Sequence, residues 1–169
     1  RTAGFSTYPI GEFTNAGLFI LIILMFIGAS PGSTGGGIKT STFFVLMQEV
    51  RCLFTKKHIG AFRRSIAGEA VSKAFIISLL SILLVCIGTF LLCILEPEYS
   101  FIQLLFEEVS AFGTVGLSTG ITPDLSVASK LILIFTMFAG RVGTSTLLSM
   151  WIDRSTPSAH YTEESIIIG

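Results

Sequence analysis

Two short Thr-x-Gly loops carry the residues whose types and spacing are best suited to chemistry. Thr2-Ala3-Gly4-Phe5-Ser6-Thr7 recurs 112 positions later as Thr114-Val115-Gly116-Leu117-Ser118-Thr119. A dehydrated cation needs several oxygen atoms at contact distance, and backbone carbonyls supply them where glycine permits an unusual backbone. We expect Gly4 and Gly116 to take that role, together with Gly113 and Gly120 beside the second loop. Both loops are therefore interpreted as parts of a cation filter.

The two loops belong to a longer internal repeat. Residues 2–34 and 114–146 share 13 identities in 33 ungapped pairs. In each copy the loop precedes an apolar run, which is typical of a pseudosymmetric membrane protein. Thr-x-Gly alone is also common in tight turns, so its duplication at equivalent positions is what favours a filter.

The composition indicates a chain that lies in a lipid bilayer. It is 51% hydrophobic and only 13% charged, with a mean hydropathy of +0.79, which is too apolar for a soluble domain of this length. Residues 74–95 carry no charge and span about 33 Å as a helix, enough to cross the hydrocarbon core. The net charge of zero gives no reason to expect a nucleic-acid partner.

The first loop leads into a crossing that is interrupted at mid-depth. The apolar run 17–27 is too short to cross alone, and the sequence GASPGSTGGG at 28–37 is unsuitable for a helix. Non-helical backbone at that depth survives only where it is buried in protein or lines a water-filled cavity. The uninterrupted basic charges of 51–64 then predict a cytoplasmic loop.

The second loop follows a helix too short to span, 101–112, which must be re-entrant. We therefore expect an all-α membrane protein of repeated helix–re-entrant half-helix–filter loop–helix units, with about one and a half units present. Because the chain opens inside a unit, we expect it to be a piece of a longer protein. The predicted segments are 1–50 (filter loop and broken helix, with an intramembrane loop at 28–38), 51–70 (basic loop), 71–152 (outer helix 71–95, half-helix 101–112, filter 113–120, inner helix 126–152) and 153–169 (cytoplasmic tail).

The glycine-rich segment 28–39 admits two readings. Gly32 and Gly37 followed by Lys39-Thr40 look like a phosphate-binding loop, but Ile38 separates Gly37 from the lysine, where that motif needs them adjacent. The alternative is a flexible plug in an ion path, where the hydroxyls of Ser30, Ser33 and Thr34 can meet a passing ion. The spacing favours the plug.

Charged residues within the predicted membrane segments include Arg141, Glu107 and Glu108. Arg141 aligns with Ala29 in the repeat, so we expect it at the depth of the plug, either as a gate element bonding the plug's carbonyls or as a structural anchor. Glu107 and Glu108 lie late in the half-helix. They either attract cations or pair with an upstream basic residue, and the sequence leaves these alternatives open.

Several strings of the chain resemble the Trk/Ktr/HKT superfamily of potassium transporters. They are TAGFST at 2–7, GASPGSTGGGIKTST at 28–42, SAFGTVGLSTGITPDLS at 110–126 and MFAGRVG at 137–143, and the tail ending SIIIG looks most like the bacterial Ktr membrane subunit. The resemblance implies four units around one pore, with these loops as the third and fourth of its filter. It also implies that 28–38 is a gating loop that Arg141 helps to close.

The resemblance implies a set of site residues and partners. The expected filter residues, which bind K+ mainly through backbone carbonyls, are Thr2, Ala3, Gly4, Phe5, Thr114, Val115, Gly116 and Leu117. The expected gate residues are Gly28, Ser30, Pro31, Gly32, Ser33, Thr34, Gly35, Gly36, Gly37, Lys39 and Arg141. Family members form homodimers in the cell membrane, most often the bacterial inner membrane, and work with a cytoplasmic nucleotide-binding ring. Uptake in the Ktr branch is stimulated by Na+, and no covalent cofactor is expected.

Two other functions compete with potassium uptake through such a channel or symporter. One is the ion-translocating subunit of a potassium-pumping P-type ATPase, which shares the pore plan. The other is an ATP-binding membrane enzyme that uses residues 32–40, although we expect no enzyme. Leu117 and Ser118 stand where potassium channels have Tyr-Gly, so selectivity is expected to be looser.

Overall fold

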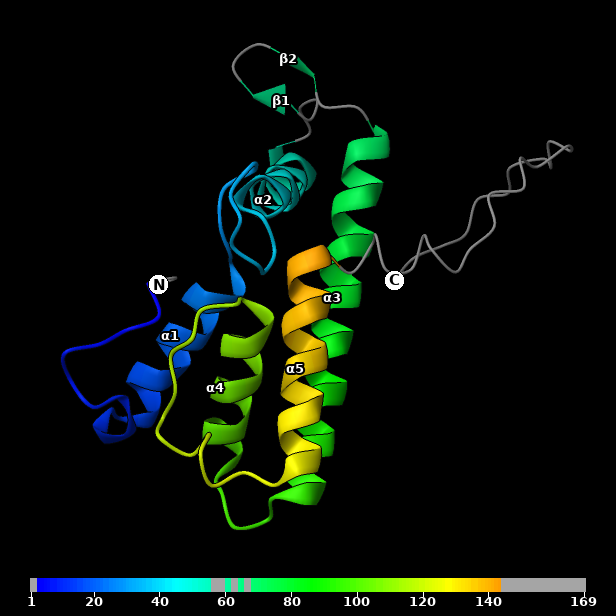
Figure 1. Cartoon of the computed structure of the whole chain (residues 1–169). Helices are drawn as coiled ribbons and strands as arrows, with labels where there is room; N and C mark the ends of the chain where they lie inside the picture. Colours follow the sequence, from blue (N-terminus) through cyan, green and yellow to red (C-terminus); the bar gives the residue numbers. More distant parts are fainter. Residues whose placement is uncertain (1–2, 56–59, 62–63, 66–67, 144–169) are drawn as a thin grey trace, which may run out of the picture.

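The computed structural model describes residues 3–55, 60–61, 64–65 and 68–143 of the 169-residue chain. These residues are mainly helical, as predicted, with one short antiparallel ribbon in which Gly60 pairs with Ser65 (Figure 1). The elements are η1 (Ile10–Glu12), α1 (Asn15–Phe26), α2 (Thr40–Thr55), β1 (Gly60–Ala61), β2 (Arg64–Ser65), α3 (Gly68–Leu95), α4 (Phe101–Phe112) and α5 (Val127–Val142).

Polar side chains mark where three of the helices begin. The Thr14 hydroxyl accepts a hydrogen bond from the Gly17 N–H at 3.2 Å ahead of α1. The Ser126 hydroxyl accepts from the Ser129 N–H at 3.3 Å at the start of α5. At α4 the Gln103 carbonyl accepts from the Ser100 N–H at 3.1 Å. Each hydrogen bond satisfies a backbone N–H at the start of a helix, where no carbonyl within the helix is available to accept it.

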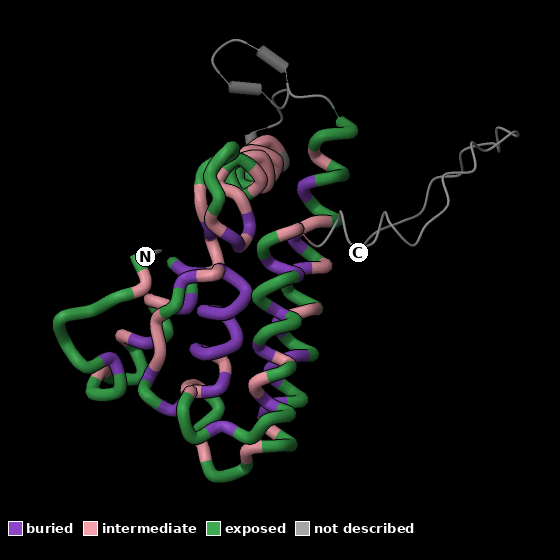
Figure 2. The backbone as a smooth tube through the Cα atoms, viewed as in Figure 1, coloured by how far each residue is buried: buried purple, intermediate pink, exposed green. Residues whose placement is uncertain are grey.

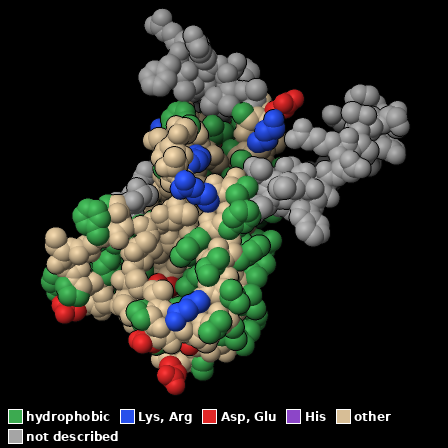
Figure 3. Space-filling model, viewed as in Figure 1, with side chains coloured by type: hydrophobic (Ala, Val, Ile, Leu, Met, Phe, Trp, Pro, Cys, Tyr) green, Lys and Arg blue, Asp and Glu red, His purple; other side chains and the backbone are tan. Residues whose placement is uncertain are grey.

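Helix α3 is the long apolar element, and among the described residues it alone is long and apolar enough to cross a membrane. It has 28 residues and begins at Gly68, three residues before the predicted start at residue 71. Large apolar side chains such as Phe75 and Phe90 are exposed along it. Hydrophobic side chains also gather on the face of α3 and α5 that Figure 3 shows. That surface suits contact with lipid or with further membrane helices.

Helix α4 is the centre of the packing. It lies between α1 on one side and the α3–α5 pair on the other (Figure 1). Leu104, Phe106, Glu108, Val109 and Phe112 are all buried, and the purple section of the tube in Figure 2 follows this helix. A half-length helix surrounded in this way is positioned by its neighbours, so the loop that leaves its end is held firmly as well.

Helix α5 covers the described part of the predicted inner helix 126–152. It ends at Val142, where Gly143 has a φ of +93°, which a right-handed helix cannot include. Residues 144–152 and the predicted tail 153–169 lie outside the described residues.

Candidate cation filter and intramembrane loop

The two Thr-x-Gly loops lie against each other. Gly4 and Gly116 both have left-handed φ angles, +78° and +88°, which only glycine adopts without strain. A β-carbon built on Gly4 would overlap the carbonyl oxygen of Val115, and one built on Gly116 would lie 3.6 Å from the Cα of Gly4. Loops 112 positions apart in the sequence are therefore neighbours, with a backbone carbonyl at their contact.

The second loop turns directly off the end of α4. The N–H of Thr114 donates to the Ala111 carbonyl at 3.0 Å, and the N–H of Val115 donates to the Ser110 carbonyl at 2.9 Å. Thr114 has a φ of +50°, which is uncommon for a residue with a side chain. The loop therefore leaves the helix in a bent conformation rather than as an extended strand.

Gly113 departs from the expected role. We predicted an unusual backbone there, but its φ is −71°, in the ordinary helical region. Glycine is needed at this position for space instead, because a β-carbon would lie 2.9 Å from the Met25 carbonyl oxygen and 3.0 Å from a methyl of Val115. The left-handed φ falls one residue later, on Thr114.

The remaining predicted filter residues differ in burial. Val115 is buried, whereas Ala3 and Phe5 are exposed, Phe5 at 80%. Thr2 lies outside the described residues. A cavity of about 280 Å³ borders the second loop, lined by Glu107, Ser110, Ala111, Thr114, Gly116, Leu117, Ser118, Thr122, Leu133 and Met137.

Glu107 and Glu108 point in different directions. The Glu107 carboxylate accepts hydrogen bonds from the segment that follows the second Thr-x-Gly loop, including the Thr119 N–H at 2.8 Å. Glu108 instead faces α3 and α5, where it accepts from the Thr136 hydroxyl at 2.8 Å. Of the two alternatives, pairing with a basic residue is not found for either carboxylate within the part of the chain that the structure describes.

The segment between α1 and α2 forms a closed loop. Ile27 and Ile38 make a parallel bridge, and the N–H of Gly28 donates to the Ile38 carbonyl at 2.8 Å. Lys39 closes the loop from inside, because its ammonium donates to the carbonyls of Ser33 at 3.0 Å and Gly35 at 2.7 Å. Ser33 adds a short internal bond, accepting from the Gly35 N–H at 3.3 Å.

This loop touches the second Thr-x-Gly loop directly. The N–H of Gly36 donates to the Thr114 hydroxyl at 2.9 Å. A β-carbon on Gly36 would lie 2.9 Å from the Phe112 carbonyl oxygen and 3.0 Å from Thr114 side-chain atoms, so only glycine fits this approach. The predicted gate residues 30–34 are exposed.

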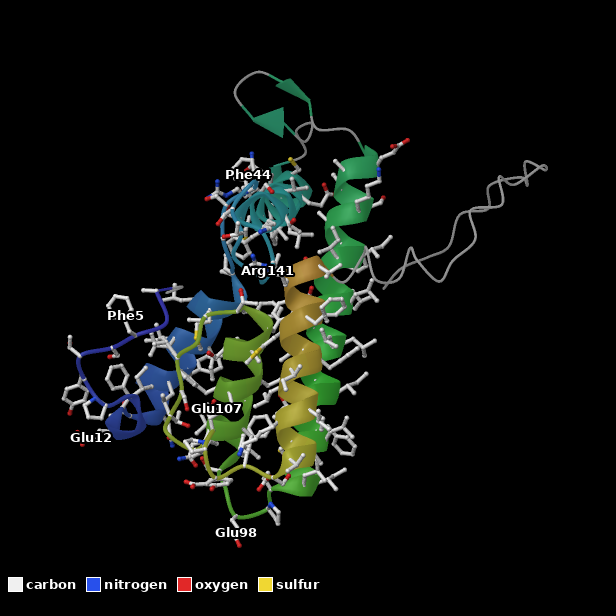
Figure 4. All side chains as sticks on the ribbon, viewed as in Figure 1. Phe5, Glu12, Phe44, Glu98, Glu107 and Arg141 are labelled. Carbon is white, nitrogen blue, oxygen red and sulfur yellow. The ribbon has the colours of Figure 1, made fainter. Side chains whose placement is uncertain are left out.

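Arg141 does not take part in that contact. It is exposed at the end of α5, and it makes no hydrogen bond or ion pair with any residue that the structure describes (Figure 4). The cation that bonds the loop's carbonyls is Lys39. Lys39 was among the predicted gate residues, but its bonds to the loop carbonyls were not predicted. The sequence indicated only that Lys39 follows Gly37 by two residues.

The half-helix α4 ends in a glycine loop that lies beside a second such loop, an arrangement that suits cation binding by backbone carbonyls. Residues 1–164 match the TrkH family of cation transport proteins, and the chain belongs to that family. It is therefore part of a multi-pass protein of the cell membrane.

The chain is 41% identical over 172 residues to the Ktr system potassium uptake protein D of Bacillus subtilis, and 39% identical over 170 residues to its Ktr system potassium uptake protein B. It is 38% identical over 176 residues to the potassium/sodium uptake protein NtpJ of Enterococcus hirae. In all three comparisons it is covered completely but spans only 38% of the relative's length.

The fold is that of a solved relative. The crystal structure of the potassium transporter TrkH from Vibrio parahaemolyticus matches 89% of the chain with a TM-score of 0.72, at 22% identity and over 34% of its own length. The resemblance to the Trk/Ktr/HKT superfamily is confirmed by these matches.

Proposed function

We propose that this chain contributes two of four filter loops to a pathway for potassium uptake across the cell membrane. The observation that carries the proposal is the contact of Gly4 with the Val115 carbonyl, with left-handed φ angles at both Gly4 and Gly116. Two glycine loops that meet at a carbonyl supply the oxygen ligands with which a filter replaces the water around a cation. In this proposal, two further units outside this chain complete a pseudo-fourfold pore.

The proposed ion is K+, bound at Thr2–Phe5 and Thr114–Leu117, with Na+ as a stimulating or accompanying ion. The names of the relatives support both, since two are potassium uptake proteins and NtpJ is a potassium/sodium uptake protein. Leu117 and Ser118 stand where a potassium channel has Tyr-Gly, so the loop keeps only the central glycine of that motif. We therefore expect weaker exclusion of Na+.

The proposed gate is the intramembrane loop 28–38, which lies against the inner end of the filter. Two contacts support this assignment: the Gly36–Thr114 hydrogen bond and the closure of the loop by Lys39. In the proposal the loop moves away for ions to pass, and Arg141 meets it in another state of the transporter.

The proposed organisation follows the relatives of the Ktr system. The predicted segments 1–50, 51–70, 71–152 and 153–169 form one and a half pore units with their cytoplasmic connections. The transporter forms a homodimer, and a cytoplasmic nucleotide-binding ring regulates it. We propose a transport role without enzymatic activity, as the names of the potassium uptake relatives suggest. Lys39 donates to the carbonyls of Ser33 and Gly35, so its ammonium is engaged within its own loop, which disfavours the phosphate-binding alternative.

Potassium uptake by cells that lack their own uptake systems tests the proposal. The full-length transporter containing this segment is expected to restore growth at low potassium, and Gly116→Ser to abolish growth or admit Na+. Gly68→Ser is the control, because a β-carbon on Gly68 would meet no atom within 4 Å and Gly68 lies at the start of α3, outside the proposed filter and gate. If both variants grew equally well at low potassium and took up Na+ equally, Gly116 would not be part of the filter. If growth were restored only when a P-type ATPase was also present, the function as a pump subunit would be favoured.

A further inference from the structure

We propose that Glu107 is a positioning residue of the cation filter, whose carboxylate holds the segment that leaves the second loop. The inference rests on the proposed function of Thr114–Leu117. Glu107 lies in α4 with 4% of its surface exposed, between the helix and the chain that follows the filter (Figure 4).

Four donors from residues 118–122 converge on this carboxylate. Oε1 accepts from the Ser118 hydroxyl at 2.7 Å, the Thr119 N–H at 2.8 Å and the Thr119 hydroxyl at 3.1 Å. Oε2 accepts from the Thr122 hydroxyl at 2.8 Å. Both oxygens are therefore engaged by the protein chain, Oε1 by three donors and Oε2 by one. These bonds attach the segment 118–122 to α4 through one side chain.

The cost of burying a carboxylate explains why so many donors are needed. A buried carboxylate without partners is strongly unfavourable, and hydrogen bonds from hydroxyl and backbone groups offset that cost. The segment 118–122 supplies hydroxyls at three of its five positions, Ser118, Thr119 and Thr122. All three point at Glu107, so the segment is folded around this one side chain.

A second side chain on the same face of α4 holds the filter itself. Ser110 lies three residues after Glu107, so the two share one helix face. Its hydroxyl donates to the Leu117 carbonyl at 2.6 Å, and its carbonyl accepts from the Val115 N–H at 2.9 Å. The chain from Val115 to Thr122 is thus attached to α4 at successive points, with Glu107 at the outer end.

The attachment of residues 115–122 to α4 affects ion selectivity, because the carbonyl oxygens of the filter must stay at the spacing that suits K+, the larger ion. If the outer end of the loop is free to move, the carbonyls can close around the smaller Na+. Glu107→Gln replaces one accepting oxygen with an amide NH2, which would face hydroxyl and backbone donors. The variant keeps the size of the side chain and loses the attachment.

The test compares two neighbouring carboxylates in the full-length transporter, by K+ and Na+ uptake at matched amounts of protein in the membrane. For Glu107→Gln we expect the preference for K+ over Na+ to fall roughly tenfold, as expected for the loss of one or two charged hydrogen bonds. Glu108→Gln is the control, because Glu108 bonds Thr136 and not the filter segment. An unchanged preference in Glu107→Gln overturns the proposal.

Two milder variants keep the proposal testable if Glu107→Gln does not accumulate. Ser118→Ala and Thr122→Val each remove one donor while the carboxylate stays in place, so a smaller shift in the same direction is expected. Wild-type preference in both variants overturns the proposal. Absence of potassium uptake by the wild-type protein instead rejects the proposed function, and the filter role of Glu107 with it.

Discussion

The backbone N–H of Gly36 donates a hydrogen bond to the side-chain hydroxyl of Thr114 at 2.9 Å, across 78 positions of sequence. The donor belongs to the intramembrane loop, and the acceptor begins the second Thr-x-Gly loop. The Thr114 hydroxyl therefore anchors the glycine-rich loop against the second Thr-x-Gly loop. In the proposed gating mechanism, release of the glycine-rich loop frees this oxygen for an ion.

Thr114→Val is expected to release the intramembrane loop, because valine keeps the shape of threonine without an acceptor for the Gly36 N–H. One hydrogen bond of this kind contributes about 1 kcal/mol, so the Gly36 amide should exchange with solvent several times faster. Hydrogen exchange of the peptide around residues 33–38 measures this directly. Thr114→Ser retains the hydroxyl and should retain the protection; equal exchange in both variants would contradict the anchor.

Lys39→Met is expected to loosen the same loop from inside. The variant keeps an unbranched side chain but loses the ammonium that bonds the Ser33 and Gly35 carbonyls. Bonds from a charged donor contribute about 1.5–3 kcal/mol each, so the closed loop should be strongly destabilised and the uptake rate should rise several-fold. Lys73→Met, in the exposed first part of α3, is the matched control and should transport as the wild type does. A slower or unchanged rate in Lys39→Met would argue against the loop as a barrier.

Gly88→Ala is expected to destabilise the contact between α3 and α4. A β-carbon on Gly88 would overlap the Glu108 carboxylate, which is fully buried and has no hydrogen-bond partner at Oε2. Overpacking of this kind costs about 1–3 kcal/mol, which should appear as a lower melting temperature of the detergent-purified transporter.

The double variant Gly88→Ala/Glu108→Ala separates overlap from other effects of the alanine. Removal of the carboxylate makes room for the new methyl, so the double variant should melt above Gly88→Ala. Gly68→Ala, whose β-carbon would meet nothing within 4 Å, should melt as the wild type does. A double variant no more stable than Gly88→Ala would show that the overlap is not the cause.

The contacts of Glu96 lead us to expect that the stability of the folded protein depends on pH. It lies in the turn after α3 and accepts from the Ser126 N–H at 2.7 Å and the Ser129 hydroxyl at 2.8 Å. The backbone hydrogen bond from Ser126, followed by the side-chain bonds from Ser126 and Ser129, holds the pKa of Glu96 below its ordinary value of 4.5. A lowered pKa in the folded state stabilises the fold above pH 4.5, and this stabilisation is lost as the pH falls through the folded-state pKa.

Glu96→Gln should therefore melt at a lower temperature than the wild type at neutral pH, with a gap that narrows below pH 4.5. Thermal unfolding of the purified transporter across that range gives the measurement. Glu98→Gln, in the same turn but exposed, should leave the melting temperature unchanged. A gap that stayed constant down to the lowest pH would mean that the charge of Glu96 has no part in the contact.

Much of the candidate site could be predicted because its signals are local. A glycine kept at the same place in two copies predicted an unusual backbone at Gly4 and Gly116, and both have left-handed φ angles. The same reasoning was wrong at Gly113, because a glycine needed for space has the same appearance in a sequence as one needed for its φ. Family membership was also predictable, since long strings of residues carried it.

The duplicated loops, the interrupted apolar run and the half-helix could be predicted because they depend on residue type and spacing along the chain. The different contacts of Glu107 and Glu108 depend on helix packing, since adjacent residues of a helix point about 100° apart and the neighbouring elements determine what each one meets. It likewise placed Lys39, and not Arg141, on the carbonyls of the intramembrane loop. The contact of Gly36 with Thr114 joins distant segments. It depends on how the helices pack, which the sequence of neither segment predicts alone.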